Sequence, residues 1–467
     1  MNPMLNRLLL FTVALSTTCM ADWPTHRANL ARTGATDDQP LPGTPRVVWV
    51  FESNEHFIAS PVIADNKLIV SSLGFSNLPA IYALNLEPAA KERIAWKKSP
   101  PALRQAVVCP PAYADGHLVV GDGMHQIDGG TLHCLSPVNG VSLWQLPVAG
   151  SLVHLEGSPT IVGGRVYIGG GAAGVLCVDA TKLTLNGRPT DPAAAEKLIA
   201  EKWKELTDQY EKDKKKDPDF AIPPSEDALP KPQPARLWQA GQEKMHVDTA
   251  VAVVGNRVLA GSAYLDMEKL GDRALYCLDA DTGATLWRTP LSHNPWGGPT
   301  VVGDTVLVGC SSIRFDTKEI PRGKGQVVAL ALDSGKQKWA IDIPGGVLSA
   351  IAVADGMAIF TSTDGRIRAL SVSDGSQRWT YDGKAAFFAG PAVAGGVAVA
   401  GDLKGVVHAI DLKTGKPLWK LDLAADPLAA APGMIYGSPV IHAGRIYVAT
   451  SNLESGQQKT VVVCIGS

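Results

Sequence analysis

Residues 250–287 read AVAVVGNRVLAGSAYLDMEKLGDRALYCLDADTGATLW, and this stretch shows most plainly how the chain is built. Two apolar runs flank Gly255-Asn256, a third run ends at Asp279, and the turn Asp281-Thr282-Gly283 leads into a short segment that ends in Trp287. Two-residue turns of Gly, Asn or Asp between apolar runs are typical of β-hairpins, because these residues adopt positive φ at low cost. The stretch therefore predicts four short strands joined mostly by tight turns.

The same unit recurs eight times, with a period of roughly 40 to 50 residues. Its hairpin turn is found in every unit, at Asp65-Asn66, Asp115-Gly116, Gly163-Gly164, Gly255-Asn256, Gly303-Asp304, Asp355-Gly356, Gly395-Gly396 and Ala443-Gly444. Each unit also has one tryptophan at the end of its last predicted strand or within it: Trp49, Trp96, Trp144, Trp238, Trp287, Trp339, Trp379 and Trp419. The apolar runs are nearly continuous, as expected for strands covered on both faces. We therefore predict an all-β fold, an eight-bladed β-propeller of four-stranded blades over residues 46–467.

The last unit indicates how the ring closes. It contains three strands and then the chain stops without a tryptophan strand, while Val47 to Glu52, with Trp49, lies unpaired at the other end of the chain. Pairing these two ends in one blade would remove the open edge of a linear array. We expect the N-terminal and C-terminal strands to share one blade.

One unit is interrupted by residues 181–236, a helical and Pro-rich insertion in the third blade. Asp191-Pro192 has the character of a helix start, and Ile199, Trp203, Leu206 and Tyr210 recur at helical spacing. A solvated helix packed on its own propeller and a docking arm for a partner both fit this pattern.

The N-terminus has the features of a targeting segment, with Arg7 before the apolar run Leu8 to Leu15 and a small residue, Ala21, before the expected cleavage point. We predict a signal peptide over residues 1–21, a strap over residues 22–45, and a periplasmic or secreted protein. The run is too short to span a bilayer, so no transmembrane segment is expected. A lipoprotein acylated at Cys19 is the alternative, although Thr18 stands where a smaller residue is usual.

The charge of the chain argues against one class of partner, and the placement of its cysteines argues against disulfides. The formal net charge of −2, without a basic stripe outside the insertion, argues against a nucleic-acid partner. Four cysteines share one place in the repeat, where the other four units carry alanine, which indicates a tight buried slot and no disulfides. These positions are Cys134, Cys177, Cys277 and Cys464, against Ala83, Ala329, Ala369 and Ala409.

The repeat resembles the pyrroloquinoline-quinone-like β-propeller repeat. Its outline is spelled by Ser60-Pro61-Val62-Ile63-Ala64-Asp65, by Tyr276-Cys277-Leu278-Asp279 with Thr282-Gly283 and Trp287, and by Ala409-Ile410-Asp411 with Thr414-Gly415 and Trp419. The segment Asp22 to Arg27 is similar to the leader of exported propellers of this kind. Quinoprotein alcohol dehydrogenases share this repeat with the propeller lipoprotein of the outer-membrane barrel assembly machine. The resemblance covers nearly all of the mature chain outside the insertion and implies the fold more strongly than an activity.

Two functions follow from the resemblance. A quinoprotein dehydrogenase would require pyrroloquinoline quinone with calcium on the ring axis, an Asp base and, typically, a vicinal disulfide, but the chain has no Cys-Cys pair and no haem motif. A scaffold or binding module for a protein partner or a small ligand on the loop-rich face requires none of these. We favour the binding module, keep the dehydrogenase or another enzyme as the alternative, and assign neither a catalytic residue nor a definite cofactor.

One group of side chains stands out as a candidate ligand-binding site. His56, His154, His246 and His293 lie on loops that lead into the innermost strands of different blades, so they share one face near the channel mouth. Trp296 accompanies His293, and Phe388 and Tyr436 hold nearby places in later blades. Neutral imidazoles converging on a channel suit a metal or a polar ligand. The simpler interpretation is that histidine is one tolerated polar residue in turn-rich loops.

Overall fold

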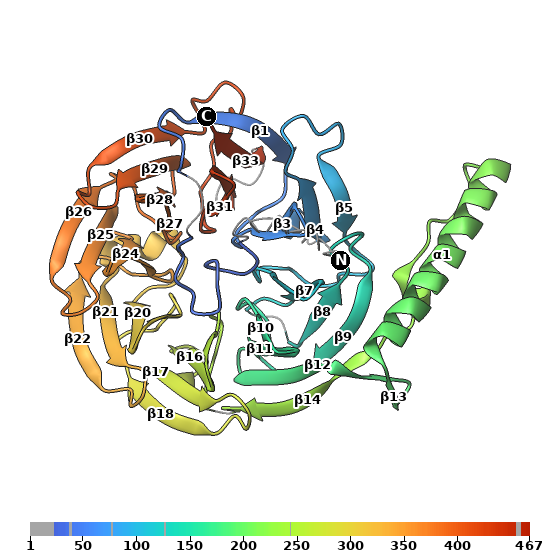
Figure 1. The fold of residues 1–467 in the computed structure, drawn as a ribbon, viewed down its shortest axis with the longest axis horizontal. Coiled ribbons are helices and arrows are strands. Elements are labelled where there is room, and N and C mark those ends of the chain that lie inside the picture. Colours follow the sequence, from blue (N-terminus) through green and yellow to red (C-terminus); the bar gives the residue numbers. More distant parts are fainter. Residues whose placement is uncertain (1–22, 37–39, 76–77, 126–127, 243, 454–458) are drawn as a thin grey trace, which may run out of the picture.

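The computed structural model describes residues 23–467 except 37–39, 76–77, 126–127, 243 and 454–458. The predicted signal peptide and Cys19 therefore lie outside the described residues. The described residues form eight antiparallel sheets arranged in a ring around a central axis (Figure 1). This confirms the all-β, eight-bladed propeller of four-stranded blades.

The first four blades, each given from its inner to its outer strand, are as follows. Blade one contains β2 (Val62–Ala64), β3 (Lys67–Phe75), β4 (Leu78–Asn85) and β5 (Ile94–Lys98). Blade two contains β6 (Ala112–Ala114), β7 (His117–Gly121), β8 (Gly130–Leu135) and β9 (Ser142–Val148). Blade three contains β10 (Thr160–Val162), β11 (Arg165–Gly169), β12 (Val175–Leu185) and β14 (Gln233–Ala240), with β13 (Arg188–Thr190) beside β12. Blade four contains β15 (Ala252–Val254), β16 (Arg257–Leu265), β17 (Leu270–Asp279) and β18 (Thr285–Pro290).

The remaining blades follow the same order. Blade five contains β19 (Pro299–Val302), β20 (Thr305–Ser311), β21 (Gly325–Ala331) and β22 (Gln337–Ile343), with the 3-10 helix η2 (Thr317–Arg322) between β20 and β21. Blade six contains β23 (Ala352–Ala354), β24 (Met357–Ser362), β25 (Arg366–Ser371) and β26 (Gln377–Asp382). Blade seven contains β27 (Ala392–Ala394), β28 (Val397–Gly401), β29 (Val406–Asp411) and β30 (Pro417–Asp422). Blade eight contains β31 (Val440–His442), β32 (Arg445–Ala449) and β33 (Thr460–Gly466), completed by β1 (Arg46–Ser53).

The eighth blade joins the two ends of the chain. β1 pairs antiparallel with β33, and Trp49 stands opposite Cys464. In Figure 1 the blue first strand lies at the outer side of the red C-terminal strands. The predicted closure is confirmed: β1 covers the outer edge of β33 and gives the last blade its fourth strand.

Each of the eight repeat tryptophans lies on the outermost strand of its blade, opposite a small residue of the third strand. The opposed pairs are Ala83 with Trp96, Cys134 with Trp144, Cys177 with Trp238, Cys277 with Trp287, Ala329 with Trp339, Ala369 with Trp379, Ala409 with Trp419 and Cys464 with Trp49. Each of these small residues is completely buried. An indole on the directly opposite residue leaves room for only a small side chain. This explains why each blade has either alanine or cysteine at this position.

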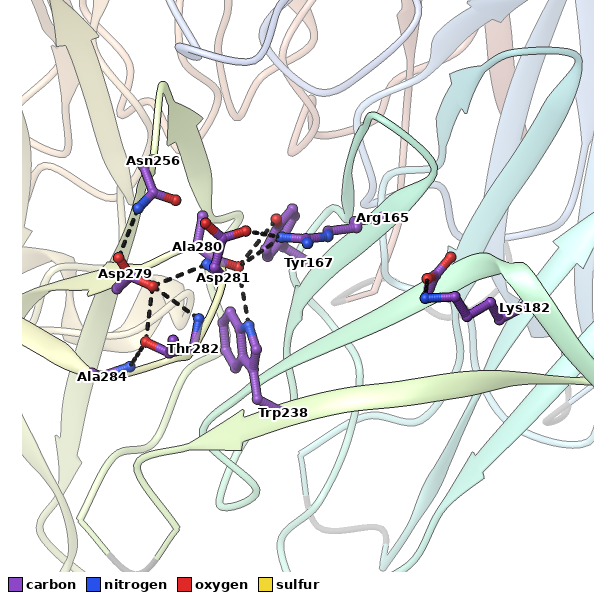
Figure 2. A network of polar contacts seen from close by, with 11 residues as sticks. Arg165, Tyr167, Lys182, Trp238, Asn256, Asp279, Ala280, Asp281, Thr282 and Ala284 are labelled. Atoms are coloured by element: carbon purple, nitrogen blue, oxygen red, sulfur yellow. Dashed lines mark hydrogen bonds and ion pairs between the residues drawn. The ribbon is translucent and has the colours of Figure 1, made fainter.

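The indole nitrogens connect neighbouring blades. Trp238 of blade three donates from Nε1 to the carbonyl oxygen of Ala280 in blade four, at 3.0 Å (Figure 2). Asp279 orders the receiving turn, because its Oδ1 accepts from the backbone N and the Oγ1 of Thr282, at 2.9 and 2.8 Å. The same type of bond runs from Trp49 to Leu86, Trp96 to Pro137, Trp287 to Leu332, Trp339 to Val372, Trp379 to Leu412 and Trp419 to Pro42.

Of the strap predicted over residues 22–45, the segment from Trp23 to Thr36 lies in the centre of the ring (Figure 1). From here on, the strap means this segment. In six blades, a backbone N–H group of the inner strand donates a hydrogen bond to a carbonyl oxygen of the strap. The donor and acceptor residues are Ile63 to Trp23, Tyr113 to Pro24, Val253 to Leu30, Val301 to Ala31, Val353 to Thr33 and Val393 to Gly34. Blade three is held differently, because the guanidinium of Arg32 donates to the Pro159 carbonyl at 3.0 Å and to Thr160 Oγ1 at 2.6 Å. The strap thus supplies acceptors that the short inner strands lack at the axis.

The insertion leaves blade three at the side of the ring. Its helix α1 (Pro192–Lys216) begins where the Asp191 side chain accepts from the backbone N of Ala194, at 2.9 Å. Ile199 packs with Val141 of blade two and with Leu229, and Trp203 and Leu206 cover this cluster. β12 and β14 extend into the segment 181–236, so the excursion from the sheet is shorter than that range.

Candidate functional site

A pocket of about 510 Å³ lies where the loops that enter the inner strands converge. All eight blades line it, through residues that include Ser60, Pro110, Ser158, Ala250, Gly297, Ala350, Phe388 and Ser438. Contributions from every blade place the pocket on the ring axis. His26 of the strap also lines it, so the strap bounds one side of this pocket.

Three imidazoles converge beside the pocket: His125, His154 and His246. One ring nitrogen from each lies within 4.8 Å of the others. The ring centroids are 5.6 Å apart for His125 and His154, 6.0 Å for His125 and His246, and 5.2 Å for His154 and His246. His154 and His246 are fully buried, whereas the side chain of His125 is 22% exposed and reaches the pocket. We call these three residues the histidine cluster.

Two of these histidines come from equivalent positions of neighbouring blades. His154-Leu155-Glu156 and His246-Val247-Asp248 both precede the inner strand of their blade, and Leu155 and Val247 are buried. Because side chains alternate along extended backbone, the histidine and the acid of each triplet point to the same side. The acids Glu156 and Asp248 line the pocket.

Asp248 holds two of the imidazoles at once. Its Oδ1 lies 2.9 Å from Nε2 of His154, and its Oδ2 lies 2.9 Å from Nε2 of His246. Glu156 Oε1 lies 3.7 Å from Nε2 of His154, and Glu268 Oε1 lies 3.5 Å from Nε2 of His125. Three carboxylates therefore surround the histidine cluster.

The charges of this group are strongly coupled. Burial, followed by the charge of Asp248, raises the pKa of Glu156 to about 7. Burial would also raise the pKa of Asp248, but the charge of His246 and the hydrogen bonds from both imidazoles outweigh it and hold this pKa well below its usual range. Burial lowers the pKa of His125. At His154 burial also acts to lower the pKa, but the hydrogen bond to Asp248 and the charges of Asp248 and Glu156 together outweigh it and raise the pKa.

Aromatic side chains line another part of the pocket. Phe388 contacts Phe315 and Tyr436, with ring centroids 5.5 Å apart in both pairs. Trp296 lines the same cavity, and its Nε1 is buried without a hydrogen-bond partner among the described residues. The pocket thus combines an apolar wall with the polar groups of His125, Glu156 and Asp248, and Arg314 also lines it.

The structure brings together only some of the residues that the sequence pointed to. Trp296, Phe388 and Tyr436 line the pocket, and the fully buried His154 and His246 meet His125, which also lines it. His56 lies apart, where its Nδ1 accepts from the backbone N of Asn452 at 3.3 Å. His293 lies outside the pocket lining, and burial together with the charge of Arg273 lowers its pKa.

Sequence reasoning missed His125. It lies between β7 and β8 of blade two, not before an inner strand, so its place in the repeat differs from that of the other two histidines. The repeated His-x-acid triplet of blades three and four was a signal for Glu156 and Asp248. No comparable pattern marks His125.

Buried histidines elsewhere in the ring form simpler pairs. His133 Nε2 lies 2.8 Å from Asp122 in blade two, and His408 Nε2 lies 3.0 Å from Asp402 in blade seven. In both pairs the aspartate also accepts backbone N–H groups, from Thr131 and Val406 respectively, and so orders the loop between two strands. Each of these histidines has an aspartate of its own, whereas His154 and His246 share one.

The donor atoms of the site indicate which ions it suits. Imidazole nitrogens are preferred by zinc, copper and nickel, whereas calcium takes six to eight oxygen ligands. The groups beside this pocket are three imidazoles with Asp248, Glu156 and Glu268. This set of nitrogen and oxygen donors does not fit a calcium centre that binds a quinone.

Comparison with known proteins agrees with this architecture. The family model described as outer membrane protein assembly factor BamB matches residues 42–201, 228–319 and 271–465. The structure of BamB from Moraxella catarrhalis has a TM-score of 0.58 at 15% identity, covering 90% of this chain and 97% of that one. A europium-containing methanol dehydrogenase has a TM-score of 0.62 at 16% identity, covering 96% of this chain and 98% of that one. At such identities the likeness shows the fold alone.

A curated relative matches a smaller part of the sequence. Tetrathionate hydrolase from Acidithiobacillus ferrooxidans is 27% identical over 125 residues, which is 22% of this chain and 24% of the hydrolase. The chain thus matches about a quarter of that protein's length. Since the family model matches most of the sequence, the chain belongs to the pyrroloquinoline-quinone-like propeller repeat family, whose model is described as outer membrane protein assembly factor BamB.

Proposed function

We propose that this protein is a binding module of the cell envelope, periplasmic or secreted, that captures a small ligand in the axial pocket of its loop-bearing face. The observation that carries the proposal is the pocket of about 510 Å³ that all eight blades line. Ligand sites of this size are typically mostly apolar, with a few convergent polar groups. The aromatic wall and the polar groups around Asp248 have this composition.

The chemistry of the pocket defines the class of ligand. The aromatic wall favours a planar or apolar body, and His125 with the neighbouring acids Glu156 and Asp248 favours a polar head. Membership of a family whose model is described as an assembly factor supports an envelope location. Among the described residues, no helix has both the length and the apolar character needed to cross a bilayer.

A fluorescent probe tests the pocket directly. We expect 8-anilinonaphthalene-1-sulfonate, which has an aromatic body and an anionic head, to bind the folded protein saturably at about one site per chain. Phe388→Ala should weaken this binding about tenfold or more, because the ring contributes to two aromatic contacts in the wall. Phe220→Ala, a change at an 81% exposed side chain beyond α1, is the matched control and should leave binding unchanged.

The outcomes separate the candidate functions. Absence of saturable probe binding, or equal binding by the Phe388→Ala and wild-type proteins, contradicts a small-ligand pocket and leaves a protein partner on this face. Reconstitution with pyrroloquinoline quinone and calcium tests the dehydrogenase, and stoichiometric quinone binding with dye reduction would overturn the binding-module proposal. Because the carboxylates Asp248 and Glu268 are paired with imidazoles, which calcium does not favour as ligands, we expect neither.

A further inference from the structure

We infer that His125, His154 and His246 bind one divalent transition-metal ion, with zinc the preferred case, at the edge of the axial pocket. This inference deepens the proposed function, because the ion would lie beside the cavity that takes the ligand. It rests on the geometry and the hydrogen bonding of the histidine cluster. It needs no property of the ligand.

Two ring nitrogens of the histidine cluster lack a hydrogen-bond partner. Nδ1 of His154 and Nδ1 of His246 are buried and make no hydrogen bond to any described residue, whereas Nε2 of His125 lies 3.5 Å from Glu268 Oε1. A buried polar atom without a partner is unfavourable, because it has lost its hydrogen bonds to water. An ion bound in the cluster would supply a partner for such nitrogen atoms.

Asp248 selects the tautomer of two of the imidazoles. A neutral imidazole that donates from Nε2 to a carboxylate keeps its lone pair on Nδ1. Asp248 accepts from Nε2 of both His154 and His246, at 2.9 Å in each case. Carboxylates commonly hold metal-binding histidines in this manner, fixing the ring orientation and raising the basicity of the ligand.

The carboxylates around the histidine cluster favour binding of a cation. Asp248, Glu156 and Glu268 contact the three imidazoles, and Arg314, at 3.9 Å from Glu268, is the basic residue paired with this group in the described structure. Negative charge in excess of positive charge around neutral nitrogen ligands favours a dication. An ion here would lower the repulsion between Asp248 and Glu156.

The size of the cluster is close to what zinc requires. Zn–N bonds of about 2.0–2.1 Å in a tetrahedral site put the ligand nitrogens about 3.3 Å apart. One ring nitrogen of each histidine lies within 4.8 Å of the others, so side-chain rotations that shorten these distances, chiefly of the less buried His125, would close the site. Three protein ligands leave a fourth position for water or for a ligand in the pocket.

Other buried histidines show why a single unpartnered nitrogen is insufficient evidence. Nδ1 of His133 is also buried without a hydrogen-bond partner among the described residues, while its Nε2 contacts Asp122. Among the described residues, His133 belongs to no group of three side chains that could share a metal ion. The distinguishing feature of the histidine cluster is that three rings meet at one point.

Metal binding is tested on the full mature chain without a polyhistidine tag. After removal of metal with a chelator and incubation with limiting Zn²⁺, we expect about one zinc per chain to remain bound after gel filtration. His125→Ala should abolish this retention, and its partly exposed position makes it the variant most compatible with folding. Asp248→Asn should weaken zinc binding about 10- to 100-fold, as removal of an orienting carboxylate does in other zinc sites.

Two controls make the outcome decisive. His133→Gln, which alters a buried histidine paired with one aspartate, should retain zinc at the wild-type level. Saturating Zn²⁺ should also raise the melting temperature of the wild-type protein but not that of the His125→Ala protein, because an ion that binds only the folded state stabilises it. If the wild-type protein retains no zinc, or if the His125→Ala protein retains as much, the inference is wrong. Failure of the fluorescent probe to bind would count against the proposed function alone.

Discussion

Gly375 shows how a single residue connects two blades. Its φ of +72° is unfavourable for residues with a side chain, and a Cβ added there would lie 2.9 Å from two carbon atoms of the Trp339 indole. The same close approach recurs at the corresponding turn glycine of four other blades, Gly140, Gly283, Gly335 and Gly415. The conformation of the turn and the position of the neighbouring tryptophan therefore depend on each other.

We predict that Gly375→Ala lowers the free energy of unfolding by about 2–4 kcal/mol, the sum of backbone strain and displacement of the Trp339 ring. Urea denaturation measures this loss. The matched control is Gly356→Ala, because Gly356 has φ +70° but no atom within 4 Å of an added Cβ. The control should lose only about 1 kcal/mol. Equal losses in the two variants would show that the contact with the indole contributes nothing.

His26 links the strap to the pH dependence of stability. Burial, with the charges of Arg32 and Arg27, lowers its pKa well below the usual 6.5. Below pH 6.5 the unfolded chain therefore binds a proton that the folded chain does not bind, so this contribution to stability is present at neutral pH and is lost as the pH falls.

We predict that the wild-type protein loses up to about 1.4 kcal/mol more per pH unit than His26→Gln between pH 6.5 and 5. Urea denaturation of both proteins across this range gives the difference. Other histidines titrate in both proteins and cancel in the comparison. Parallel stability profiles for the two proteins would mean that His26 is protonated as readily in the ring as in the unfolded chain.

At the scale of elements, the insertion is attached to the ring by a buried ion pair. Lys98 at the end of β5 is 2% exposed, and its Nζ donates to Glu226 Oε1 and Oε2 at 2.6 and 2.7 Å. Glu226 belongs to the 3-10 helix η1 (Glu226–Ala228), which follows α1. The same ammonium also donates to Ser142 Oγ, so one side chain connects blade one, blade two and the insertion.

We predict that Glu226→Gln destabilises the attachment of the insertion by about 3 kcal/mol, because it leaves the Lys98 ammonium buried without an opposite charge. Hydrogen exchange should become faster over residues 217–232 while the blade strands stay protected. Asp227→Asn, at a 52% exposed neighbour, is the control and should change little. Unchanged exchange in the Glu226→Gln protein would show that the apolar cluster around Ile199 is sufficient to hold α1.

At the scale of the whole molecule, the two ends of the chain hold the ring together in two ways. β1 completes the blade of β33, and the strap accepts hydrogen bonds from the inner part of six blades. Loss of both would expose the edge of β33 and leave buried N–H groups without acceptors. Because each blade packs against two neighbours, a defect at one blade affects the closure of all eight.

We predict that deletion of residues 22–52 abolishes cooperative unfolding, because it removes the strap and β1 together. Deletion of residues 22–36 alone, which keeps β1, should lower the melting temperature but preserve a single transition. Differential scanning calorimetry distinguishes these results. A melting transition that is unchanged in the longer deletion would contradict the view that the ring depends on its closure.

The fold was predictable at the residue and element scales because its information is local and repeated. The Gly/Asn/Asp turns, the nearly continuous apolar runs and the tryptophan of each unit depend on interactions between neighbours in the chain or between adjacent strands. Eight copies of such a signal specify the blade, and the unpaired strand around Trp49 specified closure. The slot shared by alanine and cysteine was also recognisable, although only the register explains it by placing an indole opposite each one.

The candidate site was predictable only in part, because it depends on contacts between loops that have no common place in the repeat. The sequence alone determined the eight-bladed ring, its closure, and that His154 and His246 would lie on one face. Only the tertiary structure decided that His125 joins them, that His56 and His293 do not, and that Asp248 holds two rings. The physical reason is that periodic patterns record how each blade packs, whereas a site on the axis is formed by irregular loops whose positions depend on the whole ring.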